Sequence, residues 1–235
     1  ANGSGSSNTN GSINTTKTSA NVDAGFSIIT YTGNAVEGAT VGHGLSKAPE
    51  MILLKTRGTG GWMVYHSGNT ANPATQELNL EVTEATQTSS NIWNDTAPTA
   101  DVFSLGNNGA VNGNGGTYLA YCFHSVDGYS AVGSYTGNAN ADGTFVYTGF
   151  RPSFVMTKPT GGASSWTMMD TKVNTFNVAN KYFKANTADG ENQRDNWDFL
   201  SNGFKIRNSD ADINPSGGNV IYIAFAETPF KYSNA

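Results

Sequence analysis

Carboxylate side chains are the groups in this sequence best suited to acid–base chemistry, and the reaction they would serve is sugar hydrolysis. Glycosidases place two carboxyl groups roughly 5 to 10 Å apart across the scissile bond. Candidate pairs can be drawn from six residues: Glu37, Asp142, Asp189, Glu191, Asp195 and Asp198. All six lie in polar stretches, and nothing in the sequence fixes the distance between any two of them. We therefore predict loop carboxylates, no catalytic residue and a protein that is not an enzyme.

The three histidines and the single cysteine form no pattern typical of a metal site or a nucleophile. His43, His66 and His124 show no HxxxH or HExxH spacing, whereas zinc requires several ligands in matched geometry. Cys122 and His124 share one face of an expected strand, but a thiolate–imidazole pair also needs an oxyanion hole and an orienting group. Cys122 is matched with Ala226 in the second half of the chain, so we predict a core cysteine and no cofactor.

The stretch from Asn208 to Asn214 alternates oxygen-bearing side chains, as calcium loops do. The EF-hand loop requires glycine at its sixth position and glutamate at its twelfth. This sequence has Pro215 and Ile221 there, and the corresponding loop of the first half has asparagines and no carboxylate. We therefore predict no metal site.

Tryptophan in a polar stretch is the pattern that suggests ligand binding, because exposed aromatic rings stack on sugars. Trp93 lies in NIWNDT beside Asp95, and Trp197 lies in RDNWDF beside Asp198. These four residues are the candidate ligand-binding set. The alternative is that the two rings fill the core, since duplicated large aromatics usually do so.

An internal duplication positions all of these residues. Trp62 and Trp166 are 104 residues apart, and so are Trp93 and Trp197. Four pairs of segments also correspond: GFSIITYTGN with GYSAVGSYTGN, KAPEMILLK with RPSFVMTK, GGWMVYH with SSWTMMD, and YLAYCF with YIAFAE. A repeat of this length suits one small all-β unit used twice. Trp62 and Trp166 are expected to fill the core of each unit.

Alternating apolar residues predict strands, and no stretch keeps the 3.6-residue period of a helix. Met51–Leu54 and Trp62–Tyr65 flank a glycine-rich turn and predict a hairpin. In Tyr118–His124, even-numbered residues share one face and odd-numbered residues the other. Thr75–Thr88 and Ala179–Gly190 are expected to form short strands with loops. The predicted fold class is all-β, with two tandem related β-sandwich-like units of about six or seven strands each.

Three segments are expected along the chain. Residues 1–24 hold glycine, serine, asparagine and threonine with almost nothing to bury, which predicts a polar linker or an extended arm that orders only against a neighbour. Residues 25–126 form the first β repeat and residues 127–235 the second. Each repeat would be marginally stable alone, so the two are expected to pack together. Because the chain begins with alanine and shows no signal peptide, we expect the C-terminal piece of a longer polypeptide.

Composition excludes several classes of protein. Charged residues make up 13% of the 235 residues, about half the usual fraction, and the surface is therefore expected to carry hydroxyls and amides. The net charge of −5 without a basic cluster predicts no nucleic-acid partner. No apolar run approaches the length of a membrane span, and the single cysteine excludes an intrachain disulfide.

The motifs YTGN, VGHGLSKAPEMILLK, YLAYCFHSVDGYS, DGTFVYTGFRPSFVM, DFLSNGFKIR and YIAFAETPFKY together resemble a duplicated domain of tailed-phage virion proteins, common in marine phages. That domain often follows a concanavalin A-like or laminin G-like module, in proteins described as tail-fibre, receptor-binding or virion structural. The resemblance covers residues 20–234. It implies no motif of catalytic or ligand-binding residues.

The resemblance implies a non-enzymatic virion structural protein, the C-terminal region of a tail fibre or receptor-binding appendage, located on the virion outside the cell. Expected partners are other virion subunits and a host-surface glycan or protein, and a homotrimer is the expected assembly. The long polar loops 71–99 and 171–195 are the expected binding surface. Two alternatives stay open: a capsid or tail decoration protein that contacts only virion subunits, and a polysaccharide depolymerase.

Overall fold

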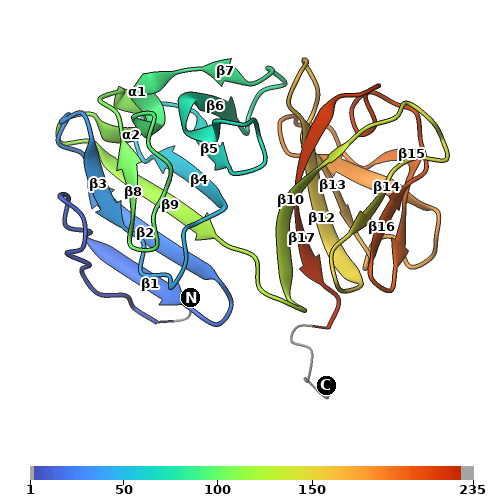
Figure 1. The fold of residues 1–235 in the computed structure, drawn as a ribbon, viewed down its shortest axis with the longest axis horizontal. Helices are drawn as coiled ribbons and strands as arrows, with labels where there is room; N and C mark the ends of the chain where they lie inside the picture. The colour runs from blue at the N-terminus through green and yellow to red at the C-terminus, as the bar shows by residue number, and fades with distance from the viewer. Residues whose placement is uncertain (1–2, 229–235) are drawn as a thin grey trace. The chain divides into compact units, whose positions relative to one another are not determined.

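In the computed structural model, strands form almost all of the regular structure of residues 3–228, the described part of the chain, which confirms the all-β prediction (Figure 1). Two compact units are present. The first comprises the residues up to Leu80 together with Thr86–His124, and the second comprises Glu81–Ala85 together with the residues from Ser125 onward. The last residues of the second repeat, with the end of YIAFAETPFKY, lie outside the described residues.

The first unit is built from one large sheet and a two-stranded ribbon. Its elements are β1 (Lys17–Asn21), β2 (Phe26–Thr32), β3 (Ala39–Gly42), β4 (Met51–Thr56), β5 (Trp62–His66), η1 (Pro73–Thr75), β6 (Gln76–Asn79), β7 (Gln87–Thr88), α1 (Ser90–Trp93), β8 (Val102–Leu105), α2 (Gly109–Asn112) and β9 (Thr117–Phe123). Seven strands form the sheet in the order β1-β2-β9-β4-β5-β6-β7, and β3 pairs with β8. Ile29 and Leu54 of the sheet join Val41 and Phe103 of the ribbon in one buried core, so the unit is sandwich-like.

The second unit is a single sheet that nearly closes on itself. Its strands are β10 (Ser130–Thr136), β11 (Phe145–Tyr147), β12 (Pro152–Pro159), β13 (Thr167–Asp170), β14 (Ala179–Lys184), β15 (Asn192–Leu200), β16 (Gly203–Ile206) and β17 (Asn219–Ala226). They run in the order β10-β17-β12-β13-β14-β15-β16-β11 and form a barrel-like sheet. The predicted strand number was too low, because β1, β7 and β11 are short edge strands whose sequences hold little apolar alternation.

The two units differ where Trp93 and Trp197 lie. Trp93 ends the short helix α1, whereas Trp197 lies in β15 and pairs with Ile206 of β16. Strand β15 thereby joins the two layers of the second unit into one sheet. In the first unit the helix interrupts this connection, and the ribbon of β3 and β8 stays separate.

The YTGN motif is the same hydrogen-bonded turn in both units. Tyr31 Oη donates to Val111 O at 2.6 Å, and the Asn34 N–H donates to Asn112 Oδ1 at 2.9 Å. The second unit repeats both bonds: Tyr135 Oη to Ile213 O at 2.6 Å, and Asn138 N–H to Asn214 Oδ1 at 2.7 Å. The duplication therefore extends from the sequence to individual hydrogen bonds.

The register of the closing strand corrects one predicted match. Cys122 pairs with Ser27, and Ala224 pairs with Ala131, which is 104 residues after Ser27. Cys122 therefore corresponds to Ala224, and the match with Ala226 was wrong by two residues. The sequence distance between equivalent residues of the two repeats becomes shorter here than the 104 residues between the tryptophans. The reason is that a tight turn joins β15 to β16, where the first unit has the longer loop 94–101 between α1 and β8.

The N-terminal segment, predicted as a polar arm, is part of the first unit. Strand β1 pairs with β2 along its whole length. Ahead of it, Ile13 is 6% exposed and Thr15 is 2% exposed. Composition did not identify this partner, because backbone hydrogen bonds to a sheet edge hold the segment, and these bonds need few apolar side chains.

Candidate functional site

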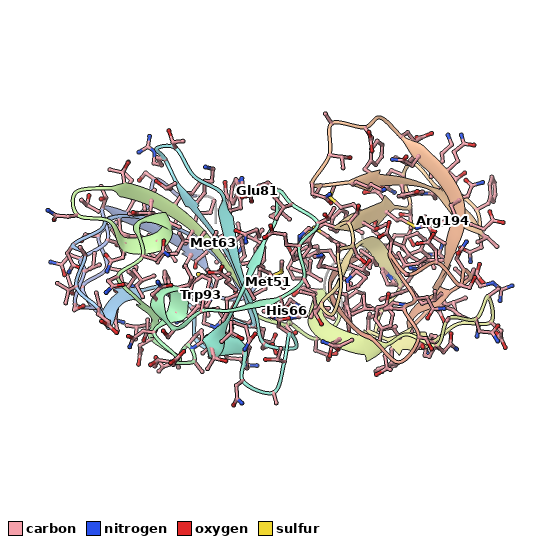
Figure 2. The ribbon with its side chains drawn as sticks, turned by 90° about the horizontal axis from the view of Figure 1, so that it is seen from above. Met51, Met63, His66, Glu81, Trp93 and Arg194 are labelled. Atoms are coloured by element: carbon pink, nitrogen blue, oxygen red, sulfur yellow. The ribbon has the colours of Figure 1, made fainter. Side chains whose placement is uncertain are left out.

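The two candidate tryptophans are core residues. Trp93 is 1% exposed and Trp197 is 0% exposed, so neither ring is accessible for stacking on a ligand. Trp93 packs edge-on against Tyr65 and Trp197 against Phe204, each with 5.8 Å between ring centroids. Figure 2 shows Trp93 and Met63 among the side chains inside the first unit. The alternative interpretation, that these rings fill the core, therefore describes both.

The other two tryptophans, Trp62 and Trp166, differ in how deeply they are buried. Trp166 is 1% exposed, as expected for a core residue. Trp62 is half-buried and stacks on Tyr121 with 6.2 Å between ring centroids. The expectation of a core position is confirmed for Trp166 and holds only in part for Trp62.

The two candidate aspartates have different surroundings. The Asp198 carboxylate lies 3.5 Å from Arg207 Nε. Asp95 is exposed and makes no ion pair within the described residues. Asp95 also lines a pocket, which makes it the starting point of the candidate site.

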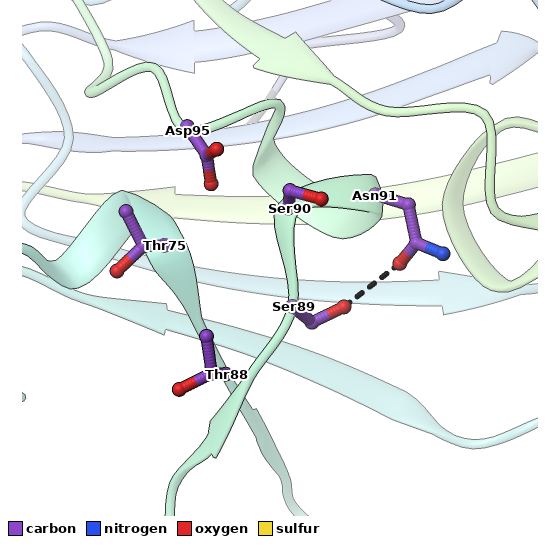
Figure 3. A pocket seen from close by; sticks show the side chains of 6 residues that line it. All are labelled: Thr75, Thr88, Ser89, Ser90, Asn91 and Asp95. Carbon is purple, nitrogen blue, oxygen red and sulfur yellow. Dashed lines mark hydrogen bonds between the residues drawn. The ribbon is translucent and has the colours of Figure 1, made fainter.

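An open pocket of about 510 Å³ lies beside Asp95 in the first unit (Figure 3). Its lining consists of Thr75, Thr88, Ser89, Ser90, Asn91 and Asp95. Three elements contribute, since Thr75 ends η1, Thr88 ends β7, and Ser90 begins α1. A neighbouring hollow of about 220 Å³ also contacts Thr75 and Asp95. The two hollows therefore share this pair of residues.

Backbone and side-chain hydrogen bonds hold the rim of the pocket. The Ser89 N–H donates to Thr75 O at 2.9 Å, which ties the residue before α1 to the end of η1. Ser89 Oγ donates to Asn91 Oδ1 at 2.7 Å, as Figure 3 shows. The position of Thr75 is fixed in turn by Asn72, whose carbonyl oxygen accepts from the Thr75 hydroxyl at 2.9 Å. These bonds fix the positions of Thr75, Ser89 and Asn91 in the rim.

A left-handed backbone turn directs the Asp95 carboxylate. Asn94 has φ of 53° and Asp95 has φ of 47°. Asparagine and aspartate are the side-chain-bearing residues that enter this region most readily. The Thr96 N–H donates to Trp93 O at 3.1 Å and closes the turn after α1. The buried ring of Trp93 therefore anchors the segment that carries Asp95.

The pocket is lined by hydroxyl groups, one amide and one carboxylate. The Asp95 carboxylate and the hydroxyls of Thr88 and Ser90 make no hydrogen bond within the described residues, so they are open to a ligand. Carboxylates accept from hydroxyl groups, and hydroxyls and amides both donate and accept. Such a lining suits a ligand with many hydroxyl groups.

Comparison with known proteins gives one family match. Residues 1–229 match the model described as a domain of unknown function, DUF7483. The chain belongs to the DUF7483 family. The match spans both units, so the family model describes the duplicated pair. No curated protein and no solved structure matches the chain.

The second unit of this DUF7483 chain has its own hollow, of about 320 Å³, in the loop between β13 and β14. Phe176 at this loop is 84% exposed. Asn174 Oδ1 accepts from the N–H groups of Asn180 and Lys181 at 3.0 and 2.8 Å. The Asn177 side chain makes two hydrogen bonds to the Phe199 backbone: its Nδ2 donates to Phe199 O, and its Oδ1 accepts from the Phe199 N–H. The predicted binding loop 171–195 therefore contains an ordered loop that presents an aromatic ring.

The alternating oxygens of Asn208–Asn214 are accounted for by a turn. Asp210 Oδ1 accepts from the Asp212 N–H at 2.8 Å, and Asp212 Oδ1 accepts from the Ser165 N–H at 3.2 Å. Arg194 forms an ion pair with Asp210. In the first unit Asn108 makes the equivalent bond to the Ala110 N–H. These residues are fixed by protein donors.

Other candidate groups are also engaged by the protein. Asp142 lies 2.7 Å from Lys205 Nζ, and the hydrogen bond and charge of this lysine lower the pKa of Asp142. His43 is 0% exposed, and burial lowers its pKa. Cys122 is 0% exposed, and burial raises the pKa of its thiol well above the ordinary value. Across residues 3–228, no three His, Cys, Asp or Glu side chains gather to hold a metal, and no helix is long and apolar enough to cross a membrane.

Sequence reasoning found the loop but missed most of the pocket. Thr75, Thr88, Ser89 and Ser90 lie outside the quoted motifs. The available signal was the run TQTSSN before the tryptophan, whose small polar residues favour a helix start and an exposed rim. The hairpin that brings Thr75 against this run is a tertiary feature.

Proposed function

We propose that this DUF7483 chain is a non-enzymatic virion protein, the C-terminal region of a tail fibre or receptor-binding appendage of a tailed phage. In this role it binds a host-surface glycan and other virion subunits, as a homotrimer outside the cell. The motifs that resemble duplicated phage virion domains support the setting. The surface poor in charge supports attachment through many polar contacts.

The observation that carries glycan binding is the pocket around Asp95. Its side chains are hydroxyls, one amide and one carboxylate, and several have no partner within the described residues. One such pocket binds a sugar weakly. Several copies on one appendage raise the effective affinity, because each further contact becomes intramolecular.

The test is binding of purified chain to a glycan array and to host envelope polysaccharide, with Asp95→Asn as the variant. Asparagine keeps the tolerance for positive φ and removes the negative charge, so the fold is expected to be unchanged. Hydrogen bonds to a charged group are stronger than neutral ones, and binding is expected to weaken about tenfold. Asp23→Asn is the matched control, since Asp23 is exposed and lies outside the pocket.

Three outcomes separate the alternatives. Glycan binding that Asp95→Asn weakens and Asp23→Asn leaves unchanged supports attachment through this pocket. Binding only to other virion subunits, with no envelope component retained, would indicate a decoration protein. Release of reducing sugars from host polysaccharide would indicate a depolymerase and overturn the non-enzymatic assignment.

A further inference from the structure

In the first unit, an extended N-terminal segment covers the edge of β3 that β8 leaves open. The Ile13 N–H donates to Thr40 O at 2.9 Å, and the Thr40 N–H donates to Ser12 Oγ at 2.9 Å. Ile13 also forms a parallel bridge with Val41. Both backbone groups of Thr40 are therefore satisfied by added chain. This position in the fold accepts an extra strand.

Strand β11 is the counterpart of β3 in the second unit. Val41 of β3 pairs with Phe103, and Val146 of β11 pairs with Phe204. Each phenylalanine packs edge-on against the tyrosine of the YTGN turn in its own unit, at 6.5 and 6.1 Å between ring centroids. The two pairs of strands thus occupy the same place in each repeat.

The edge of β11 is open within the described residues. Its strand partner is β16, and β11 ends the sheet. At the other end of this nearly closed sheet, β10 forms no strand pair with β11 among the described residues, although Thr144 Oγ1 donates to Thr136 O at 2.7 Å. Sixteen residues precede β1 in the first unit, whereas six residues join β9 to β10. The second unit has no preceding segment long enough to reach this edge as residues 12–13 reach β3.

Large aromatic side chains mark this open edge. Phe145 is 43% exposed and Tyr147 is 67% exposed, while Val146 between them is 5% exposed and points into the core. The corresponding residues of β3 are Thr40 and Gly42. Edge strands are usually protected by charge, proline or a covering segment, and β11 has none of these in the described chain.

The backbone of β11 also presents its free groups on the same edge. The Ile206 N–H donates to Thr144 O at 3.1 Å, and the Thr148 N–H donates to Asn202 O at 3.0 Å. Even-numbered residues therefore bond inward, toward the chain that contains β16. Successive residues of a strand bond to opposite neighbours, so the N–H and C=O groups of Phe145 and Tyr147 point to the open edge.

We propose that β11 pairs with β11 of a second copy of this chain, antiparallel and about a two-fold axis at Val146. Phe145 of each copy then lies opposite Tyr147 of the other, and each such pair exchanges both of its N–H···O bonds. The contact is self-complementary, as a two-fold interface must be. The nearby charge does not oppose it, because Lys205 is neutralised by Asp142 at 2.7 Å.

The expected complex is a concentration-dependent dimer. A three-residue edge buries little surface, and small interfaces are typical of transient association. The proposed homotrimer uses a different contact with three-fold symmetry, so β11 would pair chains that belong to separate trimers. The proposal does not depend on glycan binding, since the Asp95 pocket lies in the other unit.

Sedimentation velocity of the full chain, from micromolar to millimolar concentration, tests the contact. The mass is expected to rise with concentration, from 24.7 kDa to twice that value for single chains, or above three times 24.7 kDa where the proposed homotrimer has already formed. Phe145→Lys and Tyr147→Lys place charge on an exposed edge and should each weaken dimerisation at least about tenfold without unfolding the protein. Phe176→Lys is the control, because Phe176 is 84% exposed on a different loop and its replacement should change nothing.

A second measurement tests directly whether Phe145 of one copy pairs with Tyr147 of the other. The double variant Phe145→Cys with Tyr147→Cys should form a disulfide-linked dimer under mild oxidation, because directly paired residues of antiparallel strands lie within disulfide range. A mass that stays the same at every concentration overturns the proposal, and so does a rise in mass with concentration that both lysine variants leave intact. Loss of glycan binding in these variants without any change in mass would mark β11 as a ligand platform instead.

Discussion

Replacing Asn112 with alanine tests whether the turn shared by both repeats stabilises the fold. The Asn112 side chain is 0% exposed and makes three hydrogen bonds. Its Oδ1 accepts from the Asn34 N–H at 2.9 Å, and its Nδ2 donates to Val36 O at 2.9 Å and Gly106 O at 3.1 Å. Asn112→Ala removes all three and leaves their backbone partners without this side chain.

The expected loss follows from these contacts. A typical intramolecular hydrogen bond contributes about 1 kcal/mol net, so three bonds give a decrease of about 3 kcal/mol in the free energy of unfolding. Asn107→Ala is the matched control, because Asn107 is exposed and its side chain makes one contact, at 3.4 Å from Glu37. That variant is expected to stay within about 0.5 kcal/mol of the parent chain.

Two measurements report the effect. Urea unfolding followed by tryptophan fluorescence gives the free energy, with Trp93 and Trp197 as buried probes in separate units. Hydrogen exchange locates the change: residues 31–36 should lose protection while the equivalent residues 135–140 keep theirs. A decrease no larger than that of Asn107→Ala, or unchanged exchange at 31–36, would refute the role assigned to the turn.

Three further predictions concern buried titratable groups. Burial lowers the pKa of Lys158 to about 8, whereas the ordinary value is 10.5. Between these two pH values the unfolded chain binds a proton that the folded chain does not. The free energy of unfolding should therefore rise with pH, by up to about 1.4 kcal/mol per pH unit. Urea titrations across this range should show the slope, and Lys158→Met should remove it; a slope that survives the substitution contradicts the assignment. Burial lowers the pKa of His43 below 6.5, so the unfolded chain binds a proton first as pH falls through 6.5, and the melting temperature should drop there but stay flat in His43→Phe. Native protein should react with a thiol reagent about 100-fold more slowly than unfolded protein, since burial disfavours the thiolate of Cys122; rapid native labelling would show that this strand opens.

Much of the fold could be predicted because its signals are local. Strand alternation in 118–124 correctly placed Tyr118, Ala120, Cys122 and His124 on one face, and all four are buried. The hairpin of β4 and β5 followed from a glycine-rich turn between two apolar runs. The strand partners of the N-terminal segment could not be predicted, because its order depends on backbone bonds to the edges of β2 and β3, and composition does not register such bonds.

The candidate site was predictable only in part. Polarity located the loop, but the same polarity made Trp93 look accessible. Its burial depends on Tyr65, which lies far away in sequence and packs edge-on against it. The residues that do line the pocket, such as Thr75 and Ser90, are small and polar like much of the chain. Only the tertiary arrangement distinguishes them.

In each unit, the exposed groups proposed to bind a ligand or a second copy lie where the two repeats differ in structure. The hydrogen bond from the tyrosine of the YTGN turn recurs in both repeats, and both tyrosines are buried. Trp93 and Trp197 are likewise both buried. In the first unit, a helix stands where the second has β15, and the pocket around Asp95 forms beside that helix. In the second unit, only six residues join β9 to β10, and β11 ends the sheet with two exposed aromatic side chains among the described residues. A duplicated core thus leaves each copy free to acquire a different surface, and variants at Asp95 and Tyr147 should therefore affect separate measurements.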